Sequence, residues 1–447
     1  MFPKLYEVKQ ILADFFEPDP SGAVRREIGR NGLAGRYVPG QSVAVAVGSR
    51  GIQGIKGMVE AMVSSLKEMG LNPFIVPAMG SHGGATSEGQ RQVLEHLGIT
   101  EASCGAPIRS SMDVVSLGHL PSGAEVFVAR DILEADRLVL INRVKPHTAF
   151  RGQVESGICK MLAVGCGKHQ GALNMHKFGL ADTIIPAARA ILGRVSVLFG
   201  IAVLENAAEK THTVKLVLPE DFVETDSELL KTAFTLFPRI PLNDLDILVV
   251  GEMGKNISGG GMDPNVIGMW RREGGARQPD YRTVVLLNLT PESHGNAMGI
   301  GLADLTTKRV IDMVDIKTTY TNALTSGIWA AARLPISLEN DRAVLEMALS
   351  RVRDPGKVRM VHIANTLFLE TFWASEALLP ELRAKGSIEV DEAPRALRFS
   401  GEGRLLPFPG VGHEPEGKSK VSILQVIGQG FNAQIGSGQN GHFKRFV

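Results

Sequence analysis

Short runs of branched apolar residues alternate along the chain with stretches of amphipathic, helix-like spacing. The run at residues 137–142 (RLVLIN) has no polar alternation, which is typical of a strand buried on both faces. In the first half we expect strands at 42–47, 73–78, 126–129, 138–141 and 195–203, and helices at 6–16, 54–69, 87–94 and 181–192. Ser87 with Gln90 predicts a capping box for the third of these helices. Because strands and helices alternate, this half is predicted to form a parallel, doubly wound sheet.

A second series of strands and helices begins near residue 242. Strands are expected at 246–250, 283–289 and 358–363, and helices at 321–332, 336–349 and 374–383. Two prolines in the segment FPRIP (237–241) place a boundary between the two series. We therefore predict an α/β protein of two domains with mainly parallel sheets, residues 1–240 and 241–400, with an active site in the cleft between them. The tail at 401–447 either returns to the N-terminal domain or is disordered.

Composition narrows the class of protein. At 447 residues the chain is too long for one ordinary core. Lys+Arg 48 against Asp+Glu 47 gives a net charge of +1, with no basic block, so we expect neither nucleic acid nor a membrane as a partner. No window approaches the roughly 20 apolar residues of a membrane span, and the first residues lack a signal core. The three cysteines, Cys104, Cys159 and Cys166, form no CxxC pair, which favours a reducing, cytoplasmic location.

Candidate chemistry concentrates in residues 142–176, directly after the clearest apolar run. This segment contains His147, Lys160 and His176 among many glycines, which would let the backbone approach a phosphorylated or metal-bearing ligand closely. His82 likewise follows an expected strand. Open α/β sheets bind ligands at the carboxyl ends of their strands, so we expect His82 and His147 at that edge.

Imidazole transfers protons near neutral pH and is also a common ligand for nickel or zinc. Two histidines that face a planar carbon from opposite sides could serve both faces, as racemisation requires. Arg50 lies in a Gly-rich turn at the start of an expected helix, which suits an anionic group such as a phosphate or a substrate carboxylate.

Four motifs together resemble those of one family. They are GSHGGAT at 80–86 with His82, PHTAFRG at 146–152 with His147, SGICK at 156–160 ending in Lys160, and His176, sixteen residues after that lysine. Over most of residues 40–400 the chain resembles the lactate racemase family, the nickel-pincer-nucleotide-dependent racemases and epimerases of 2-hydroxy acids.

The resemblance implies an isomerase that inverts C2 of a 2-hydroxy acid by proton-coupled hydride transfer to a nickel-pincer nucleotide. It implies that this cofactor is attached covalently to Lys160 through a thioamide. The implied site residues are catalytic His82 and His147, cofactor-binding Lys160, Gly152 and Ser156, and metal-binding His176. Arg50 is added as a cofactor-binding candidate from its place at the helix start. Separate maturation enzymes that make the cofactor are implied as partners, beside the small-molecule substrate.

The chain departs from lactate racemase itself at two positions, where arginines of that enzyme are replaced by Gly83 and Cys159. The loops expected in the second domain are polar and contain Lys255, Asn265 and His294. These three side chains are candidate substrate contacts, and a cation such as Lys255 would clamp a carboxylate. We therefore expect a substrate more polar than lactate.

Other interpretations stay open. His169 shares the glycine-rich segment with His176 and could bind the metal instead. A zinc hydrolase built from His82, His147 and His176 would also need a carboxylate, for which Glu155 is the candidate. A nicotinamide-dependent dehydrogenase ranks lower, because no turn gives GxGxxG followed by an acidic residue. A non-catalytic protein that binds a sugar acid or a nucleotide would leave the histidine pair without a role.

Overall fold

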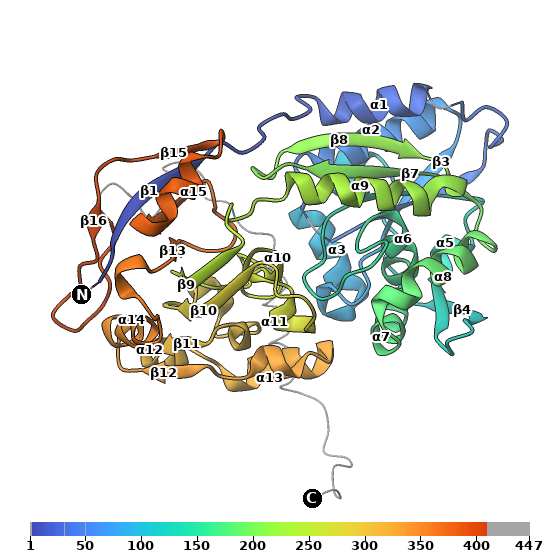
Figure 1. The fold of residues 1–447 in the computed structure, drawn as a ribbon. Coiled ribbons are helices and arrows are strands. Elements are labelled where there is room, and N and C mark those ends of the chain that lie inside the picture. Colours follow the sequence, from blue (N-terminus) through green and yellow to red (C-terminus); the bar gives the residue numbers. More distant parts are fainter. Residues whose placement is uncertain (1, 31, 50, 409–447) are drawn as a thin grey trace, which may run out of the picture.

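The computed structural model describes residues 2–30, 32–49 and 51–408. It consists of two α/β bodies that lie side by side, one with a five-stranded and one with a nine-stranded sheet (Figure 1). Residues 1, 31, 50 and 409–447 lie outside the described residues. The role expected of Arg50, and the fate expected of the tail after residue 408, therefore stay predictions.

The first body is a five-stranded sheet of order β3-β2-β6-β7-β8. Its strands are β2 (Ser42–Val47), β3 (Asn72–Pro77), β6 (Arg137–Arg143), β7 (Val197–Glu205) and β8 (Thr211–Val217). Strand β2 is parallel to β3 and β6, β6 is parallel to β7, and β8 is antiparallel. Along β2, Ala44 and Ala46 enter one core while Val43, Val45 and Val47 enter the other. Both faces of the sheet are thus buried, as the unbroken apolar runs predict.

Helices cover both faces of this sheet. They are α1 (Pro20–Arg30), α2 (Ile55–Glu68), η1 (Gly83–Ala85), α3 (Ser87–His96), α4 (Glu101–Cys104), α5 (Arg130–Leu133), α6 (Ile158–Lys160), the π-helical turn η2 (Met161–Gly165), α7 (Lys168–Lys177), α8 (Leu180–Leu192), η3 (Pro219–Asp221) and α9 (Phe222–Leu236). The capping box expected from Ser87 and Gln90 is wrong. The N-cap of α3 is Thr86, whose Oγ1 accepts the Gly89 N–H at 3.0 Å, and Gln90 is fully buried elsewhere.

Strand β5 (Glu125–Ala129) does not belong to the parallel sheet. It pairs with β4 (Val114–His119) in a separate antiparallel hairpin, so the expected place of residues 126–129 in the main sheet is wrong. Val126 and Val128 of β5 belong to the same core as Ala44 and Ala46 of β2. The Ala129 N–H donates to the Cys166 carbonyl at 2.8 Å. A strand that is buried against helices has the same apolar pattern in the sequence as a strand buried within a sheet, so the pattern of residues 126–129 could not tell the two apart.

The second body is a nine-stranded sheet of order β12-β11-β10-β9-β13-β14-β1-β15, with β16 also paired to β1. Its strands are β1 (Lys4–Gln10), β9 (Asp244–Val250), β10 (Asp280–Leu286), β11 (Leu305–Thr307), β12 (Ile336–Leu338), β13 (Met360–Ile363), β14 (Thr371–Ser375), β15 (Ile388–Val390) and β16 (Arg395–Ala396). Its helices and 3₁₀ turns are α10 (Pro264–Ile267), α11 (Trp270–Glu273), η4 (Pro291–Ser293), η5 (Ile300–Leu302), α12 (Lys308–Asp312), α13 (Ile316–Ser326), η6 (Trp329–Ala332), α14 (Asp341–Ser350), η7 (Pro355–Lys357), η8 (Glu376–Leu378) and α15 (Leu379–Arg383). Strands β9 to β13 are parallel, whereas β14, β1, β15 and β16 are antiparallel additions. The predicted α/β class with mainly parallel sheets is confirmed.

The first residues of the chain form a strand of this second sheet, so the helix expected at 6–16 is wrong, and so is the assignment of these residues to the first domain. Leu5 and Val8 have the spacing of a helix face, but both are fully buried in the second body. Strand β1 pairs along its length with β14, for example Leu5 with Ser375. Pairing with a distant strand outweighs local preference here.

Three helices expected in the second half are partly wrong. The helix expected at 321–332 stops at Gly327, which has a φ of +71° and ends α13. The one expected at 336–349 begins as edge strand β12 before α14, and the one at 374–383 contains the end of β14 before α15. Each expected range joined two short elements with similar apolar spacing.

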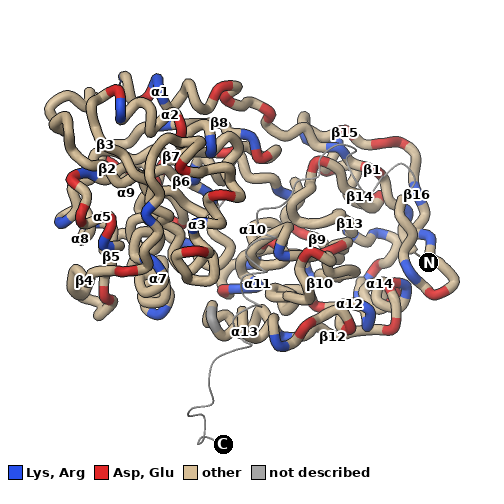
Figure 2. The backbone as a smooth tube through the Cα atoms, turned by 180° about the vertical axis from the view of Figure 1, so that it is seen from behind, with Lys and Arg blue, Asp and Glu red and all other residues tan. Residues whose placement is uncertain are grey.

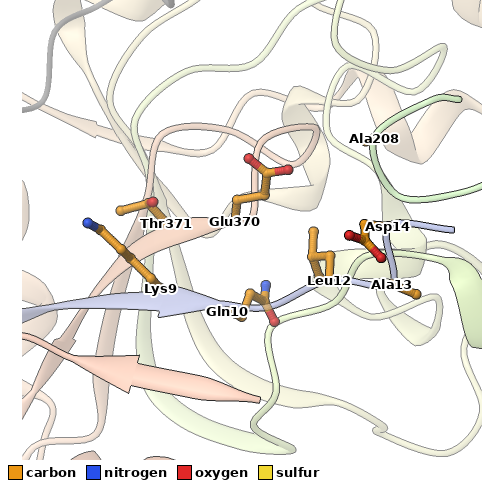
Figure 3. A pocket seen from close by; sticks show the side chains of 8 residues that line it. All are labelled: Lys9, Gln10, Leu12, Ala13, Asp14, Ala208, Glu370 and Thr371. Atoms are coloured by element: carbon orange, nitrogen blue, oxygen red, sulfur yellow. The ribbon is translucent and has the colours of Figure 1, made fainter.

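Within the described residues, the chain crosses between the bodies twice, through residues 11–19 and 237–243. Gln10 ties the two crossings, because its Nε2 donates to the Arg239 carbonyl at 3.1 Å and also to the Leu369 carbonyl. A surface pocket of about 250 Å³ lies at the first crossing, lined from β1, the residues after it, Ala208 and the start of β14 (Figure 3). It contains none of the site residues expected from the sequence.

Lys and Arg alternate with Asp and Glu over both bodies (Figure 2), in line with the balanced composition. Among the described residues, none of the helices has the length and apolarity needed to cross a membrane. Residues 401–408 stay with the second body, where Phe408 stacks on Trp373 with ring centroids 4.0 Å apart.

Candidate active site

Strand β2 is the point at which the first sheet reverses its direction of growth. The chain continues from β2 to β3 on one side and later to β6 on the other side. Loops diverge at such a switch point and leave room for a ligand at the carboxyl edge of the strands. His82 follows β3 and His147 follows β6, so the structure brings both histidine loops to this edge.

His82 is held by its own loop. Its Nδ1 lies 2.7 Å from the Met79 carbonyl oxygen, and because a carbonyl only accepts, hydrogen-bond geometry assigns the ring proton to Nδ1. Neutral His82 therefore has its lone pair on Nε2. The loop is fixed by Gln90, whose Nε2 donates to the carbonyls of Gly80 at 2.8 Å and His82 at 3.3 Å.

Behind this loop lies Lys168, which is completely buried at the start of α7 with a φ of +53°. Its Nζ donates to the Pro77 carbonyl at 2.7 Å and to Gln90 Oε1 at 3.1 Å. Desolvation lowers the pKa of this amine to about 8. Lys168 thus connects the end of β3, the Gln90 side chain that holds the His82 loop, and helix α7, which carries His176.

Lys160 ends the short helix α6, whose first N–H groups are bound by a buried carboxylate. Asp226 of α9 accepts from the Ile158 N–H at 3.1 Å and the Cys159 N–H at 2.8 Å. Desolvation raises the pKa of Asp226 to about 6, and the two hydrogen bonds oppose that rise. Lys160 continues into the π-helical turn η2, a feature frequent at functional sites.

His176 lies in the last turn of α7 and is exposed. Its pKa is lowered, first by desolvation and second by the positive charge of Lys160. The two side chains expected to hold the cofactor and the metal are therefore close enough for their charges to interact. His169 lies two turns earlier on the same face of α7, and its Nδ1 is buried without a hydrogen-bond partner among the described residues. Both histidines stay candidate metal ligands.

The face of α7 between these two histidines packs toward the His82 loop. A Cβ added to Gly80 would lie 3.2 Å from the Cβ of Ala172, which sits between His169 and His176 on that face. The loop after β3 and the last turns of α7 are therefore neighbours.

His147 has the opposite ring arrangement from His82. Its Nδ1 accepts the Ala149 N–H at 3.1 Å, so the neutral ring carries its proton on Nε2. The ring lies against Phe150, with centroids 4.5 Å apart and an interplanar angle of 40°. Its backbone N–H donates to Glu155 Oε2 at 2.7 Å.

Glu155, the carboxylate considered for a hydrolase, braces this loop. It is 1% exposed and also lies 3.2 Å from Arg151 Nη1 and 3.4 Å from the Gly152 N–H. Desolvation raises its pKa, and the hydrogen bond from the His147 backbone opposes that rise. Its oxygens are directed to protein groups of the loop.

Gly152 and Ser156, expected to contact the cofactor, also bond to protein. Besides the contact of Gly152 with Glu155, the Ser156 hydroxyl donates to the Arg143 carbonyl at 2.9 Å, at the end of β6. Several glycines of the segment serve packing, since a Cβ on Gly165 would lie 2.5 Å from the Ala78 carbonyl oxygen. Gly165 is thus required for packing, and the approach of the glycine-rich backbone to a ligand stays a prediction.

The second sheet also has a switch point, at β9, which is flanked by β10 and β13. Lys255 follows β9, and its Nζ donates to the Gly259 carbonyl at 2.6 Å. His294 is exposed in the turn after β10, with a φ of +46°. Asn265, in α10, reaches the first body, where its Nδ2 lies 3.2 Å from the His147 carbonyl oxygen. Of these three expected substrate contacts, Asn265 thus meets the histidine loop directly.

Four residues that hold the site loops in place were not among the site residues expected from the sequence: Gln90, Arg151, Lys168 and Asp226. Asp226 carried a signal, because it occupies an apolar position of α9 between Phe222 and Leu230. A lone acid on an apolar helix face indicates a buried carboxylate with backbone partners.

Comparison with known families agrees with the motifs. Residues 21–182 match the lactate racemase N-terminal domain. Over these residues the chain is similar to the lactate racemase N-terminal domain. His82, His147, Lys160 and His176 all lie within the matched residues, so the family resemblance is confirmed there.

The likeness to known proteins extends to the overall fold. The chain is similar to the lactate racemase apoprotein from Thermoanaerobacterium thermosaccharolyticum, with a TM-score of 0.51 and 13% identity, over 81% of this chain and 98% of that chain. At this identity the likeness shows the fold alone. No curated protein matches the chain in sequence. Together the matches support a racemase or epimerase in general.

Proposed function

We propose that the chain inverts the C2 centre of a 2-hydroxy acid, as a racemase or epimerase that carries a nickel-pincer nucleotide on Lys160. The observation that supports this most is the pair of histidine loops on either side of β2, whose rings hold their protons on different nitrogens. A site that handles both faces of one carbon needs two such groups.

Lys160 and His176 suit the cofactor. Attachment needs an amine, and metal ligation needs a neutral imidazole, which the lowered pKa of His176 favours at neutral pH. Lys160 would hold the nucleotide and His176 the nickel, with His169 as the rival ligand. When bound, this group would supply the acceptor for the hydride on C2.

The two histidines are prepared for different parts of the proton transfer. His82 presents a basic Nε2 and can take the substrate hydroxyl proton directly, because Met79 holds the other proton on Nδ1. His147 presents Nε2–H and can donate a hydrogen bond to a substrate oxygen. Its Nε2 can act as a base only after the ring proton has moved from Nε2 to Nδ1, which breaks the contact of Nδ1 with the Ala149 N–H.

A substrate more polar than lactate fits the second body. The turns after β9 and β10 gather polar groups: Thr290 Oγ1 lies 2.7 Å from Asn256 Oδ1 and 2.8 Å from Ser293 Oγ, and the Lys255 N–H donates to Ser293 Oγ at 2.9 Å. The buried hydroxyls hold these turns in place, and the Lys255 ammonium could bind an additional carboxylate of a substrate placed between the two switch points.

The test is intact mass and nickel content of protein produced together with pincer-cofactor maturation enzymes. We expect a cofactor-sized adduct with stoichiometric nickel in the wild type and in the matched surface variant Lys177→Ala, and neither in Lys160→Ala. Loaded protein should then invert C2 when 2-hydroxy acids are screened by chiral chromatography. Unmodified Lys160 in every sample would refute the proposal.

The main alternative, a zinc hydrolase, requires three protein ligands around one metal. No group of three or more His, Cys, Asp and Glu side chains in the described part of the chain could hold a metal ion. The same samples test this alternative, because stoichiometric zinc on unmodified protein with hydrolytic activity would favour it. A non-catalytic protein that binds a sugar acid would bind ligand without turnover.

A further inference from the structure

The side-chain amide of Asn265 joins the two bodies. Its Nδ2 donates to the His147 carbonyl at 3.2 Å and to Asp263 Oδ1 at 2.8 Å, while its Oδ1 accepts from Arg151 Nη2. Asp263 caps α10 and Asn265 is in its first turn, so this amide is built on a helix start of the second body. His147 and Arg151 belong to the loop after β6 of the first body.

All three partners agree on one orientation of this amide. If the amide were turned over, its NH₂ group would face the guanidinium of Arg151 and its oxygen would face two acceptor oxygens. A group whose donor and acceptor sides are both matched across an interface is a specific contact. These bonds leave the Asn265 amide little capacity for a substrate.

Arg151 is the centre of the same contact. Its Nη1 lies 3.1 Å from the His147 carbonyl oxygen and 3.2 Å from Glu155 Oε2, so one guanidinium group bonds to both bodies. Burial raises the pKa of Glu273 in α11 and of Glu155, and the positive charge of Arg151 opposes both rises. The guanidinium also lies over the Phe234 ring of α9, 5.2 Å from the centroid.

Resting on the proposed function, we propose that Arg151 and Asn265 form an interdomain latch that positions His147 for proton transfer. The latch holds both ends of the segment 147–151, because Asn265 bonds to the carbonyl oxygen of His147 and to the side chain of Arg151. Ala149, whose N–H bonds to His147 Nδ1, lies inside this held segment. When the bodies separate at the two crossings, the latch opens and the ring loses its fixed proton arrangement.

The latch makes Arg151 and Asn265 positioning residues. Two α/β bodies joined by short crossings are expected to move relative to each other unless specific contacts hold them. A charge-assisted contact placed beside a catalytic histidine ties that movement to the geometry of the histidine. The site is then complete only when the bodies are together.

The experiment uses the full chain without cofactor, labelled with ¹⁵N-histidine and identified at His147 by comparison with His147→Gln. We expect Asn265→Ala and Arg151→Ala each to change the ¹⁵N shifts of the His147 ring from one fixed tautomer toward a mixture. Small-angle scattering should show a larger radius of gyration for both. Gln278→Ala, an exposed amide of the second body, should match the wild type.

Arg151→Lys separates geometry from charge. Lysine keeps a positive charge between Glu155 and Glu273, but it lacks the planar fork that bonds to His147 and Asn265 together. We expect it to behave like Arg151→Ala. If Arg151→Lys or Asn265→Ala keeps the wild-type ring shifts and radius of gyration, the latch is refuted.

Loaded enzyme gives the functional readout. At unchanged nickel content, kcat should fall about tenfold to hundredfold in Asn265→Ala, with a smaller change in KM. Failure of the proposed function would appear as protein without adduct or turnover, whereas the ring shifts and radius of gyration would still report the latch. The two failures are therefore distinguishable.

Discussion

Replacing Asp226 by asparagine should change how the stability of the protein depends on pH. Asp226 is fully buried and accepts two backbone N–H groups at the start of α6, directly before Lys160. Burial raises its pKa from 3.8 to about 6. The folded protein therefore keeps a proton on Asp226 in a pH range where the unfolded chain has released it.

The direction and size of the pH dependence of stability follow from this difference in pKa. Because the folded state binds more protons between pH 3.8 and about 6, the stabilising contribution of Asp226 is complete below pH 3.8 and is lost as pH rises through 6. At 1.36 kcal/mol for each unit of pKa, the loss is about 3 kcal/mol. The amide that replaces the carboxyl group in the variant cannot titrate, so the variant lacks this dependence.

The assay is urea unfolding of Asp226→Asn and wild type at several pH values between 4 and 7.5. Unfolding should be followed by far-ultraviolet circular dichroism. Tryptophan fluorescence would report on the second body, because the three tryptophans (Trp270, Trp329 and Trp373) all lie there, whereas Asp226 lies in the first. The free energy of unfolding of the wild type, relative to the variant, should fall by roughly 2–2.5 kcal/mol between pH 4 and 7.5, which is most of the total loss. Asp182→Asn, an exposed carboxylate on α8, is the control. A difference that is constant, or that grows with pH, would contradict the reasoning.

Three further predictions concern the same region. Burial lowers the pKa of Lys168 to about 8, so between pH 8 and 10 the unfolded chain still binds a proton that the folded protein has released. The wild type should therefore gain about 2–3 kcal/mol of stability over Lys168→Met as pH rises through this range. Denaturation curves of the two proteins that keep a fixed separation would disprove this. Lys160→Met should raise the pKa of His176 in an NMR titration, because the lysine charge lowers it, and an unchanged midpoint would mean that the two side chains are too far apart. Gly157→Ala should lower the free energy of unfolding by at least about 2 kcal/mol, because Gly157 has a φ of +112° and the new Cβ would overlap the buried carboxylate of Asp226. A variant as stable as wild type in thermal unfolding would exclude that clash.

The elements that the sequence predicted well are those whose pattern was fixed by local burial. The runs that became β2, β3 and β6 are buried on both faces by neighbouring strands and helices, so their apolar stretches had one interpretation. The loops that follow such strands could be placed at one edge for the same reason. The sequence alone therefore predicts neighbouring positions for His82 and His147.

Other features depended on contacts between distant residues. Gln90 has the spacing of a helix cap, but its amide is drawn inward because Lys168, Gly80 and His82 offer buried partners. Arg151 lies in an apparently ordinary loop, and its importance arises only because Asn265 of the other body meets it. A single sequence gives no information about such partners until the chain is folded.

Strand β1 has a consequence for how the protein is made. Its residues leave the ribosome before those of the first body, yet the strands beside it, β14 and β15, are synthesised after the whole of the first body and most of the second. The first body can thus complete its sheet during translation, while β1 remains an unpaired strand with apolar Leu5 and Val8 exposed to other chains. A fragment that starts at residue 241 would lack this strand and present the bare edge of β14. Expression of the second body alone should therefore favour aggregation unless residues 2–10 are supplied, for example fused after residue 408.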